Sequence, residues 1–271
     1  MDRGAKVAMT VAGSDSGGGA GVQADMLSFA ANGVFATSAV AALTAQNPSG
    51  VRGIFAPPPE FLTAQMEAVW EYFRPSAAKC GMLFSAPIVG AAADFFERRR
   101  EIALVVDPVM VSTSGAELLS PDAAAALMER LAPLARLVTP NLDEARRMLG
   151  CPKISAGDMP QRAVQLAEKL GTSVLLKGGH AEGGDILTDI LASPEGGLAQ
   201  FRSPRVEGID SHGSGCTLSA AVCARLALGE GLAAAVANAR AYLASGMAEP
   251  VAAGGECFIN HFPNRKPRRL Q

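Results

Sequence analysis

Apolar runs and amphipathic stretches alternate along the chain, and this alternation predicts the fold class. Short runs rich in Val, Ile, Leu and Ala predict buried strands, while the longer stretches between them carry apolar residues at helical spacing. Alternating strands and helices are typical of βαβ units around a mainly parallel sheet. The predicted strands are 7–12, 34–43, 77–82, 102–106, 137–139 and 174–176, and the predicted helices are 21–31, 58–73, 86–99, 121–131, 142–149 and 159–170.

The last third of the chain departs from this pattern. Residues 185–191 and 198–201 flank a turn-rich segment and predict an antiparallel hairpin near a sheet edge. Two helices, 215–228 and 232–247, follow the hairpin, and residues 260–271 are expected to form a flexible, solvated basic tail. We therefore expect one α/β domain over residues 1–271, with helices on both faces of the sheet.

Residues 26–51 carry no charge, which raises the possibility of a membrane segment. Asn32, Gly33, Gln46 and Asn47 interrupt the stretch, and its apolar content is mostly Ala, so a helix, a turn and a buried strand fit better. The N-terminus enters a strand within a few residues and lacks the features of a signal peptide. We expect no membrane segment and no export.

Charge and cysteine usage narrow the class of protein. The 24 basic and 26 acidic side chains give a formal net charge of −2, which argues against a nucleic-acid-binding protein. The five cysteines contain no C-x-x-C pair and suggest neither a disulfide scaffold nor a zinc site, so we expect a cytoplasmic location. They are Cys80, Cys151, Cys216, Cys223 and Cys257.

A first glycine loop, residues 13–21, lies between the first predicted strand and the first predicted helix. Ligands of open α/β sheets bind beyond the carboxyl ends of strands, and glycine lets backbone N–H groups approach them closely, so we expect a binding loop rather than a flexible turn. A dinucleotide loop is weakly supported, because no acidic residue lies roughly twenty residues further on. A Walker A loop is excluded, because no Lys in the chain is directly followed by Ser or Thr.

A second glycine loop, residues 210–217, opens the predicted helix at residue 215. A helix N-terminus presents unpaired N–H groups and a positive dipole end, which suit an anion or a transferring phosphoryl group. Cys216 lies in this field, which predicts a thiol pKa below its usual value of about 8.5 and a better base or nucleophile. The alternative is a buried structural cysteine, as Cys223 is expected to be. A serine-hydrolase elbow is not supported, because no G-x-S-x-G occurs.

Polar side chains follow three further predicted strands. Asp107, Asn141, Glu144 and Lys177 are of the types that hold Mg²⁺, its waters and phosphate oxygens. Asn141 and Glu144 also fit a helix capping box, so a purely structural role is the alternative for this pair. Together with the glycine loops, these residues indicate phosphoryl transfer.

Two histidines lie in the predicted site loops. His180 and His212 could titrate or bind a metal, but they lack the spacing of metal ligands. We expect each to have a hydrogen-bonding role in a loop instead.

A series of motifs runs in order over nearly the whole chain. They are Ala12-Gly-Ser-Asp-Ser-Gly-Gly-Gly-Ala-Gly-Val-Gln-Ala-Asp25, Ala42-Leu-Thr-Ala-Gln-Asn47, Lys79-Cys-Gly-Met82, Asp107-Pro-Val-Met110, Thr139-Pro-Asn-Leu-Asp-Glu144, Lys177-Gly-Gly-His180 and His212-Gly-Ser-Gly-Cys-Thr-Leu-Ser219. The series resembles the hydroxymethylpyrimidine/phosphomethylpyrimidine kinases of thiamine biosynthesis, within the ribokinase-like superfamily. The resemblance implies a ribokinase-like domain that uses ATP and Mg²⁺ to phosphorylate 4-amino-5-hydroxymethyl-2-methylpyrimidine, and then its monophosphate.

The resemblance also implies a role for each matching residue. Gln46 would bind the aminopyrimidine edge, since a side-chain amide offers both a donor and an acceptor. Cys216 stands where related sugar kinases carry an Asp base, and a loose phosphoryl-transfer transition state tolerates this exchange because it needs little deprotonation of the nucleophile. Lys177 would contact phosphate. The other implied residues are Gly13, Ala20, Thr44, Met82 and Val109 around the ring, Gly213, Ser214 and Gly215 in the anion hole, Thr139 and Asn141 at ATP, and Asp107 and Glu144 at Mg²⁺.

Three alternatives remain. A pyridoxine or pyridoxal kinase of the same superfamily phosphorylates a similar hydroxymethyl group, although Gln46 and Met82 favour the pyrimidine. A nicotinamide-dependent oxidoreductase would explain only the first loop, and a non-catalytic nucleotide-binding module would not need Cys216.

The resemblance also implies a homodimer. Ser214 replaces the Thr that is commoner in the family and keeps its hydroxyl.

Overall fold

The computed structural model describes residues 4–111, 115, 117–179, 185–206 and 212–263. Its centre is a nine-stranded sheet in the order β3-β2-β1-β4-β5-β6-β7-β8-β9, and a separate pair, β10 and β11, lies near the C-terminal end. The strands are β1 (Val7–Gly13), β2 (Phe35–Asn47), β3 (Gly50–Phe55), β4 (Ala77–Cys80), β5 (Ala103–Val106), β6 (Leu137–Val138), β7 (Val174–Leu176), β8 (Ile186–Ala192), β9 (Leu198–Pro204), β10 (Val251–Ala253) and β11 (Glu256–Phe258).

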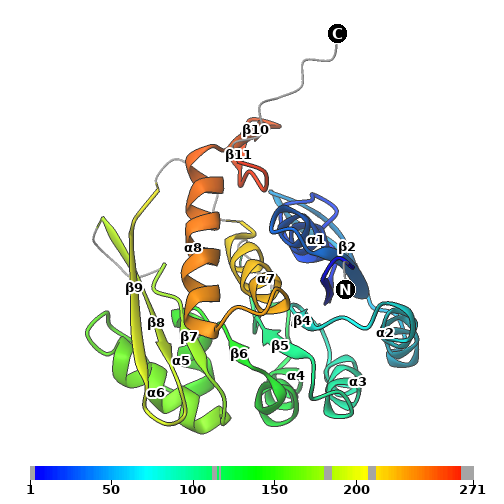
Figure 1. Cartoon of the computed structure of the whole chain (residues 1–271), viewed down its shortest axis with the longest axis horizontal. Helices are drawn as coiled ribbons and strands as arrows, with labels where there is room; N and C mark the ends of the chain where they lie inside the picture. Colours follow the sequence, from blue (N-terminus) through cyan, green and yellow to red (C-terminus); the bar gives the residue numbers. More distant parts are fainter. Residues whose placement is uncertain (1–3, 112–114, 116, 180–184, 207–211, 264–271) are drawn as a thin grey trace.

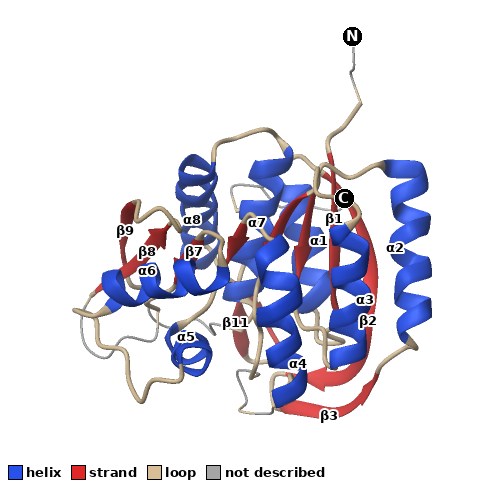
Figure 2. Ribbon diagram, turned by 90° about the horizontal axis from the view of Figure 1, so that it is seen from below, coloured by secondary structure: helices blue, strands red, loops and turns tan. Residues whose placement is uncertain are grey.

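The sheet is parallel in its middle and antiparallel at both edges. Strands β2, β1, β4, β5, β6 and β7 run in the same direction. Strands β3, β8 and β9 pair antiparallel with their neighbours. The expected α/β class and the edge hairpin, which is β8 and β9, are confirmed. The chain enters β1 at the top of Figure 2, so the parallel strands end toward the bottom, where β3 lies.

Helices cover both faces of the sheet (Figure 1). Helices α1, α7 and α8 pack on one face, and α2 to α6 pack on the other. The helices are α1 (Gly21–Ala31), α2 (Pro59–Phe73), α3 (Ala86–Glu97), α4 (Pro121–Ala126), α5 (Leu142–Leu149), α6 (Met159–Leu170), α7 (Ser214–Ala227) and α8 (Leu232–Ala248). None of the helices described is both long and apolar enough to cross a membrane.

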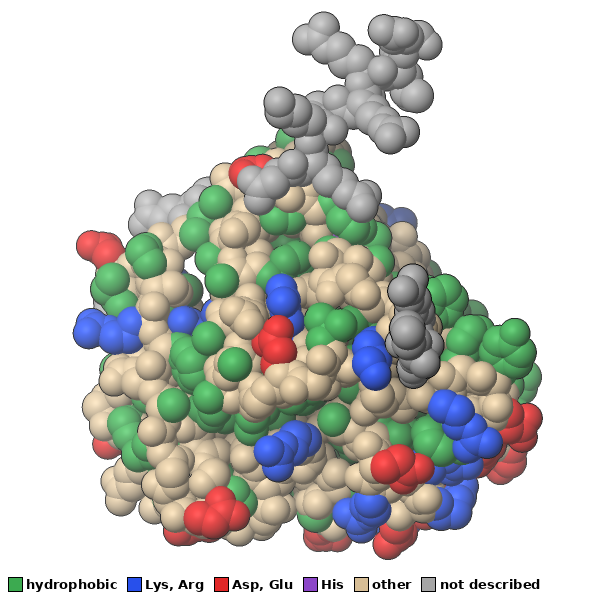
Figure 3. Space-filling view, viewed as in Figure 1, with side chains coloured by type: hydrophobic (Ala, Val, Ile, Leu, Met, Phe, Trp, Pro, Cys, Tyr) green, Lys and Arg blue, Asp and Glu red, His purple; other side chains and the backbone are tan. Residues whose placement is uncertain are grey.

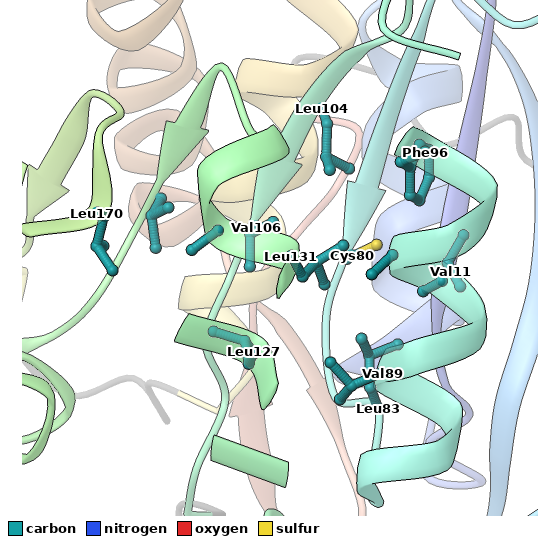
Figure 4. Close-up of a cluster of buried hydrophobic side chains, with 14 of the residues drawn as sticks. Val11, Cys80, Leu83, Val89, Phe96, Leu104, Val106, Leu127, Leu131 and Leu170 are labelled. Carbon is teal, nitrogen blue, oxygen red and sulfur yellow. The ribbon is translucent and has the colours of Figure 1, made fainter. Parts of the chain in front are cut away.

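The two faces are filled by different side chains. Figure 4 shows the larger core, where Val11 and Val106 of the sheet lie near Phe96 of α3 and near Leu127 and Leu131, all almost fully buried. On the other face, α7 buries a row of alanines (Ala220, Ala221 and Ala224). Small side chains let a helix lie close to the strands beneath it, because interiors pack without voids. This close approach brings the N-terminus of α7 to the carboxyl edge of the sheet.

The structure corrects three predictions of elements. Strand β2 continues to Asn47, and β3, which was not predicted, pairs with its exposed end. The helix predicted over 121–131 is an α-helix only over Pro121–Ala126, and Leu127–Leu131 continue it as a π-helix. Strands β10 and β11 were also not predicted.

The first residues of the expected C-terminal tail are packed against the protein. Asn260 donates its backbone N–H to Gly246 O at 3.0 Å, and His261 is buried. Residues 260–263 are therefore packed rather than solvated, and the rest of the expected tail lies outside the described residues. On the face drawn in Figure 3, acidic and basic side chains are interspersed, in keeping with the near-neutral net charge.

Candidate active site

The carboxyl ends of β1, β4, β5, β6 and β7 surround a cavity of about 960 Å³. This is the edge at which open α/β sheets bind ligands. Every predicted site residue except Thr139 lines the cavity: Gly13, Ala20, Thr44, Gln46, Met82, Asp107, Val109, Asn141, Glu144, Lys177, Gly213, Ser214, Gly215 and Cys216. Thr139 lies fully buried behind the wall.

The first glycine loop is organised around the carboxylate of Asp15. One carboxylate oxygen accepts a hydrogen bond from Gly17 N at 2.8 Å, and the other accepts one from Ala20 N at 2.9 Å. The backbone N–H of Asp15 donates to Gln23 Oε1 at 2.9 Å. The loop is therefore fixed by hydrogen bonds, unlike the flexible turn considered as its alternative.

The end of β2 is fastened to this loop. The Thr44 hydroxyl donates to Ser14 O at 2.9 Å. The Ser16 hydroxyl donates to Gln46 O at 2.7 Å and accepts from Gln46 N at the same distance. These bonds fix the backbone of Gln46 at the cavity wall.

The wall beneath Gln46 depends on a glycine. A methyl group on Gly13 would lie 2.5 Å from Met82 Cε, so a larger residue would displace the Met82 side chain. Ala20 and Val109 line the same cavity. Gln46 and this mostly apolar wall form a pocket suited to a flat ring with polar groups on one edge.

The second glycine loop contacts the first. Gly213 caps the N-terminus of α7 with φ 81°, and a methyl group on it would lie 1.8 Å from Gly19 O. Glycine is required here for both reasons. A methyl group on Gly215 would lie 3.2 Å from Lys177 Nζ and 3.5 Å from Asp107 Oδ2. The first turn of α7 therefore faces the charged part of the cavity.

The prediction of a lowered thiol pKa at Cys216 is wrong. Burial raises the pKa of Cys216 to about 11. Lys79 and the Gly21 N–H lower it, but the negative charges of Asp25 and Asp107 add to the effect of burial. Desolvation of the thiolate thus outweighs the positive field at the start of the helix.

Asp107 and Lys177 form the charged centre of the cavity. Lys177 Nζ lies 3.0 Å from Asp107 Oδ1, the Thr139 hydroxyl donates to the same oxygen at 3.1 Å, and Ser219 donates to Asp107 Oδ2 at 3.3 Å. Burial would raise the pKa of Asp107, but Lys177 and Lys79 hold it below its usual value. Thr139 therefore supports Asp107 rather than lining the cavity.

Asn141 and Glu144 form the capping box that was considered as their alternative role. Asn141 Oδ1 accepts from Glu144 N, and Glu144 Oε2 accepts from Asn141 N, both at 2.8 Å. Both residues also line the cavity. Burial raises the pKa of Glu144 to about 7; Lys177 lowers it, and the nearby Asp107 raises it further. Capping thus accounts for the fold of α5 and leaves an ionisable carboxyl group at the cavity.

A buried ion pair for which no role was predicted lies beneath the cavity. Lys79 Nζ lies 2.9 Å from both carboxylate oxygens of Asp25, and neither side chain is exposed. The Thr10 hydroxyl donates to Asp25 Oδ2 at 2.6 Å. Burial would lower the pKa of Lys79, but Asp25 and the other negative groups keep it above its usual value. The position of Lys79 within an apolar predicted strand could have indicated this pair, because a lysine is rarely buried without a partner.

Of the two histidines in the predicted site loops, the structure describes only His212. His212 Nε2 lies 2.9 Å from Asp15 Oδ2, which confirms a loop hydrogen bond. His180 lies outside the described residues. Beyond Lys177 the cavity reaches β8 and α8, where Leu187, Leu243 and Met247 give it an apolar end.

The sequence of this chain is similar to those of known proteins over most of its length. A family model described as phosphomethylpyrimidine kinase matches residues 15–260. The hydroxymethylpyrimidine/phosphomethylpyrimidine kinase of Rhizobium meliloti is 46% identical over 240 residues, which are 88% of each chain. The thiamine biosynthesis bifunctional protein ThiED of Geobacter sulfurreducens is 45% identical over 250 residues, and these span 91% of this chain but only half of that relative.

Among solved structures, the pyridoxal kinase of Bacillus subtilis in an ADP complex superposes with a TM-score of 0.88. It is 32% identical in sequence, and the match covers 96% of this chain and 98% of that one. The similarity therefore extends over nearly the whole chain.

Proposed function

This chain belongs to the phosphomethylpyrimidine kinase family, and from that premise we propose that it phosphorylates 4-amino-5-hydroxymethyl-2-methylpyrimidine and then its monophosphate, with ATP as the phosphoryl donor. The product would be the pyrimidine diphosphate used in thiamine biosynthesis. The observation that carries the proposal is the single cavity in which Gln46, Cys216, Lys177 and Asp107 meet.

The ring pocket supports a pyrimidine acceptor. The backbone of Gln46 is held on both sides by Ser16, so its amide can be presented at a fixed position on the wall. An amide pairs with a ring nitrogen and a neighbouring amino group at once. Met82 and Val109 offer apolar surface for the ring faces.

The first turn of α7 supports phosphoryl transfer. The backbone N–H groups from Gly213 to Cys216 would stabilise the negative charge on the transferring group, and Lys177 would contact its oxygens. The acceptor hydroxyl oxygen forms a bond to the γ-phosphorus while the bond from that phosphorus to the bridging oxygen breaks, which releases ADP. The hydroxyl proton would pass to the Cys216 thiolate, the minor form at neutral pH. In the second step the acceptor is already an anionic phosphate and needs no base.

Asp107 and Glu144 fit a magnesium site. They are buried carboxyl groups on one wall, and their mutual repulsion is of the kind that a divalent cation relieves. Bound Mg²⁺ would neutralise charge on the ATP phosphates. Within the described part of the chain no three His, Cys, Asp or Glu side chains form a metal cluster, so phosphate oxygens and waters would complete the coordination.

The decisive experiment is an ATP-consumption assay that compares the pyrimidine alcohol, its monophosphate and pyridoxal. We expect turnover of both pyrimidines. Pyridoxal is the second candidate acceptor, because the fold matches a pyridoxal kinase over nearly its whole length. A clear preference for pyridoxal, with no activity on the monophosphate, would overturn the proposal.

We further propose a cytoplasmic homodimer. All five cysteines are free thiols, which suits a reducing compartment. Apolar side chains are exposed around β2, β3 and α2, where a second copy could cover them: Phe35, Leu43, Phe55, Phe61 and Tyr72. Light scattering during gel filtration tests the dimer, and the mass of a single chain would contradict it.

A further inference from the structure

We propose that Asp15 and His212 act as a positioning pair that holds the ring pocket in register with the phosphoryl-transfer site. The proposal rests on the proposed function, because it assigns a role in the same two-part site. Asp15 belongs to the first glycine loop, and His212 directly precedes the cap of α7. Their side chains meet across 197 positions of sequence, at 2.9 Å between His212 Nε2 and Asp15 Oδ2.

The Asp15 carboxylate accepts a hydrogen bond from each of three neighbours. Oδ1 accepts from Gly17 N, while Oδ2 accepts from both Ala20 N and His212 Nε2. An ionised carboxylate offers acceptors on both oxygens, whereas an amide turns one end into a donor. Asn at this position would therefore place its side-chain NH₂ group against either the Gly17 N–H or the N–H groups of Ala20 and His212, so that donors would face donors. The Asp15 side chain is 4% exposed, so water does not readily replace a lost partner.

The protonation of the pair follows from the same contacts. Burial would raise the pKa of Asp15, but the hydrogen bonds from His212 and Gly17 hold it below its usual value. The carboxylate is thus ionised at neutral pH and can only accept. His212 Nε2 must therefore carry the hydrogen that joins the two loops.

The backbones of the two loops are also in contact. A methyl group on Gly19 would lie 2.9 Å from His212 Cδ2, and one on Gly213 would lie 1.8 Å from Gly19 O. The two loops therefore pack closely at these glycines, and the Asp15–His212 bond joins them at the same place. The bond thus sets how far the first loop lies from the start of α7.

That separation matters for the reaction. Ala20, whose N–H is bound by Asp15, lines the ring pocket, and the residues after His212 form the anion hole. A substrate must span both parts, with its acceptor oxygen in line with the γ-phosphorus. Misplacing reacting atoms by about 1 Å can cost on the order of 100-fold in rate. Neither Asp15 nor His212 needs to touch the reacting atoms to have this effect.

The test combines hydrogen exchange with steady-state kinetics on the full chain. The variants are Asp15→Asn, His212→Leu, His212→Gln and the double variant Asp15→Asn/His212→Leu. Asp158→Asn is the matched control, because Asp158 also caps a loop, through Ser155, but lies outside the cavity. Thermal unfolding of each variant confirms that it is folded at the assay temperature.

The first readout needs no activity. His212→Leu should speed amide exchange at Gly17 and Ala20 in the first loop, although the substitution lies far away in sequence. His212→Gln keeps an N–H donor and should restore much of the protection. Unchanged exchange in a folded His212→Leu variant would overturn the proposal, and this result would stand whatever the acceptor of the enzyme is.

The second readout is kinetic. We expect kcat/KM for the pyrimidine alcohol to fall by roughly 10- to 100-fold in Asp15→Asn and in His212→Leu, with KM for ATP changed less than about 2-fold. The double variant should lose little more than Asp15→Asn alone, since the bond to His212 is one of those that the Asp15 substitution disturbs. Additive losses, or equal rises in both KM values, would contradict a positioning pair. An inactive wild-type chain with normal loop coupling would instead count against the proposed function.

Discussion

At Cys216, two effects on the thiol oppose each other. The start of α7 and Lys79 favour the thiolate, as the position of the residue in the sequence suggests, whereas burial disfavours it. Burial dominates and raises the pKa to about 11. A cysteine with this pKa serves as a base only through a small thiolate fraction, so its contribution should be confined to the step that removes a proton.

The first prediction follows from this restriction. Cys216→Ala should lower turnover of the pyrimidine alcohol by about 100-fold or more, within the range for general bases, and turnover of the monophosphate by less than about 10-fold. The reason is that only the alcohol must lose a proton from a neutral hydroxyl group. Measuring both rates on the same preparation checks it. Equal losses in both steps would show that Cys216 has a different role.

The second prediction concerns pH. Because the thiol pKa is raised to about 11, the thiolate fraction grows roughly tenfold per pH unit throughout the range from 7.5 to 9.5. The ratio of the alcohol rate to the monophosphate rate should rise with pH in the wild type. Groups that affect both steps, such as Glu144, change both rates alike, so their pH dependence cancels in the ratio. In Cys216→Ala the ratio should be flat, and a flat ratio in the wild type would exclude the thiolate as base.

Among the elements, those with strong local signals were predicted from the sequence. Helices α5 and α6 have the predicted bounds, because Gly150 and Gly171 at their C-terminal caps and their apolar spacing act within a few residues, and α1 also has its predicted bounds. Strand β3 was missed because it is exposed, contains glycine and Arg52, and exists only by pairing with β2. Pairing energy of this kind depends on the neighbouring strand and leaves little trace in the sequence of the strand itself.

The third prediction tests the element that carries Lys177. Gly178 donates its N–H to Asp189 Oδ1 at 2.9 Å, and a methyl group on it would lie 2.1 Å from Thr188 O in β8. Gly178→Ala should therefore shift the Lys177 loop, raise KM for ATP by about 10-fold in both steps, and destabilise the fold by about 1–3 kcal/mol.

The control for this prediction is Gly157→Ala, where the added methyl group would meet only Ser155 Oγ at 3.9 Å. Steady-state kinetics and thermal unfolding of both variants provide the comparison. If Gly178→Ala kept the wild-type KM for ATP, then the close approach to β8 would not position Lys177.

Across the whole molecule, the site depends on contacts between segments far apart in the chain. Residues at strand ends were predictable, because parallel strands end at one edge. The pairs Lys79–Asp25 and Gly215–Lys177 were not, since no local pattern indicates which distant side chains meet. The one continuous sheet from β1 to β9, with α7 and α8 packed back onto it, supports our proposal that residues 1–271 form a single domain.

The fourth prediction concerns the C-terminal segment that joins the first and last helices. His261 is buried, with Nδ1 3.3 Å from both the Ser28 hydroxyl of α1 and the Tyr242 hydroxyl of α8. Burial lowers the pKa of His261 to about 4, whereas a histidine in the unfolded chain has its ordinary pKa of about 6.5. Between these values the unfolded chain binds more protons, so the free energy of unfolding should fall as pH decreases from 6.5 to 4.

The full effect of His261 amounts to about 3 kcal/mol, most of it lost by pH 4.5. Urea unfolding at pH 7.5, 6.0, 5.0 and 4.5 measures it, with His261→Gln as the comparison because Gln is of similar size and does not titrate. Carboxyl groups and the Asp15–His212 pair are present in both proteins and cancel in the difference. The wild type should therefore lose more stability than His261→Gln over this range. Parallel curves for the two proteins would show that His261 is accessible to protons in the folded state, and that the C-terminal segment does not hold α1 and α8 together.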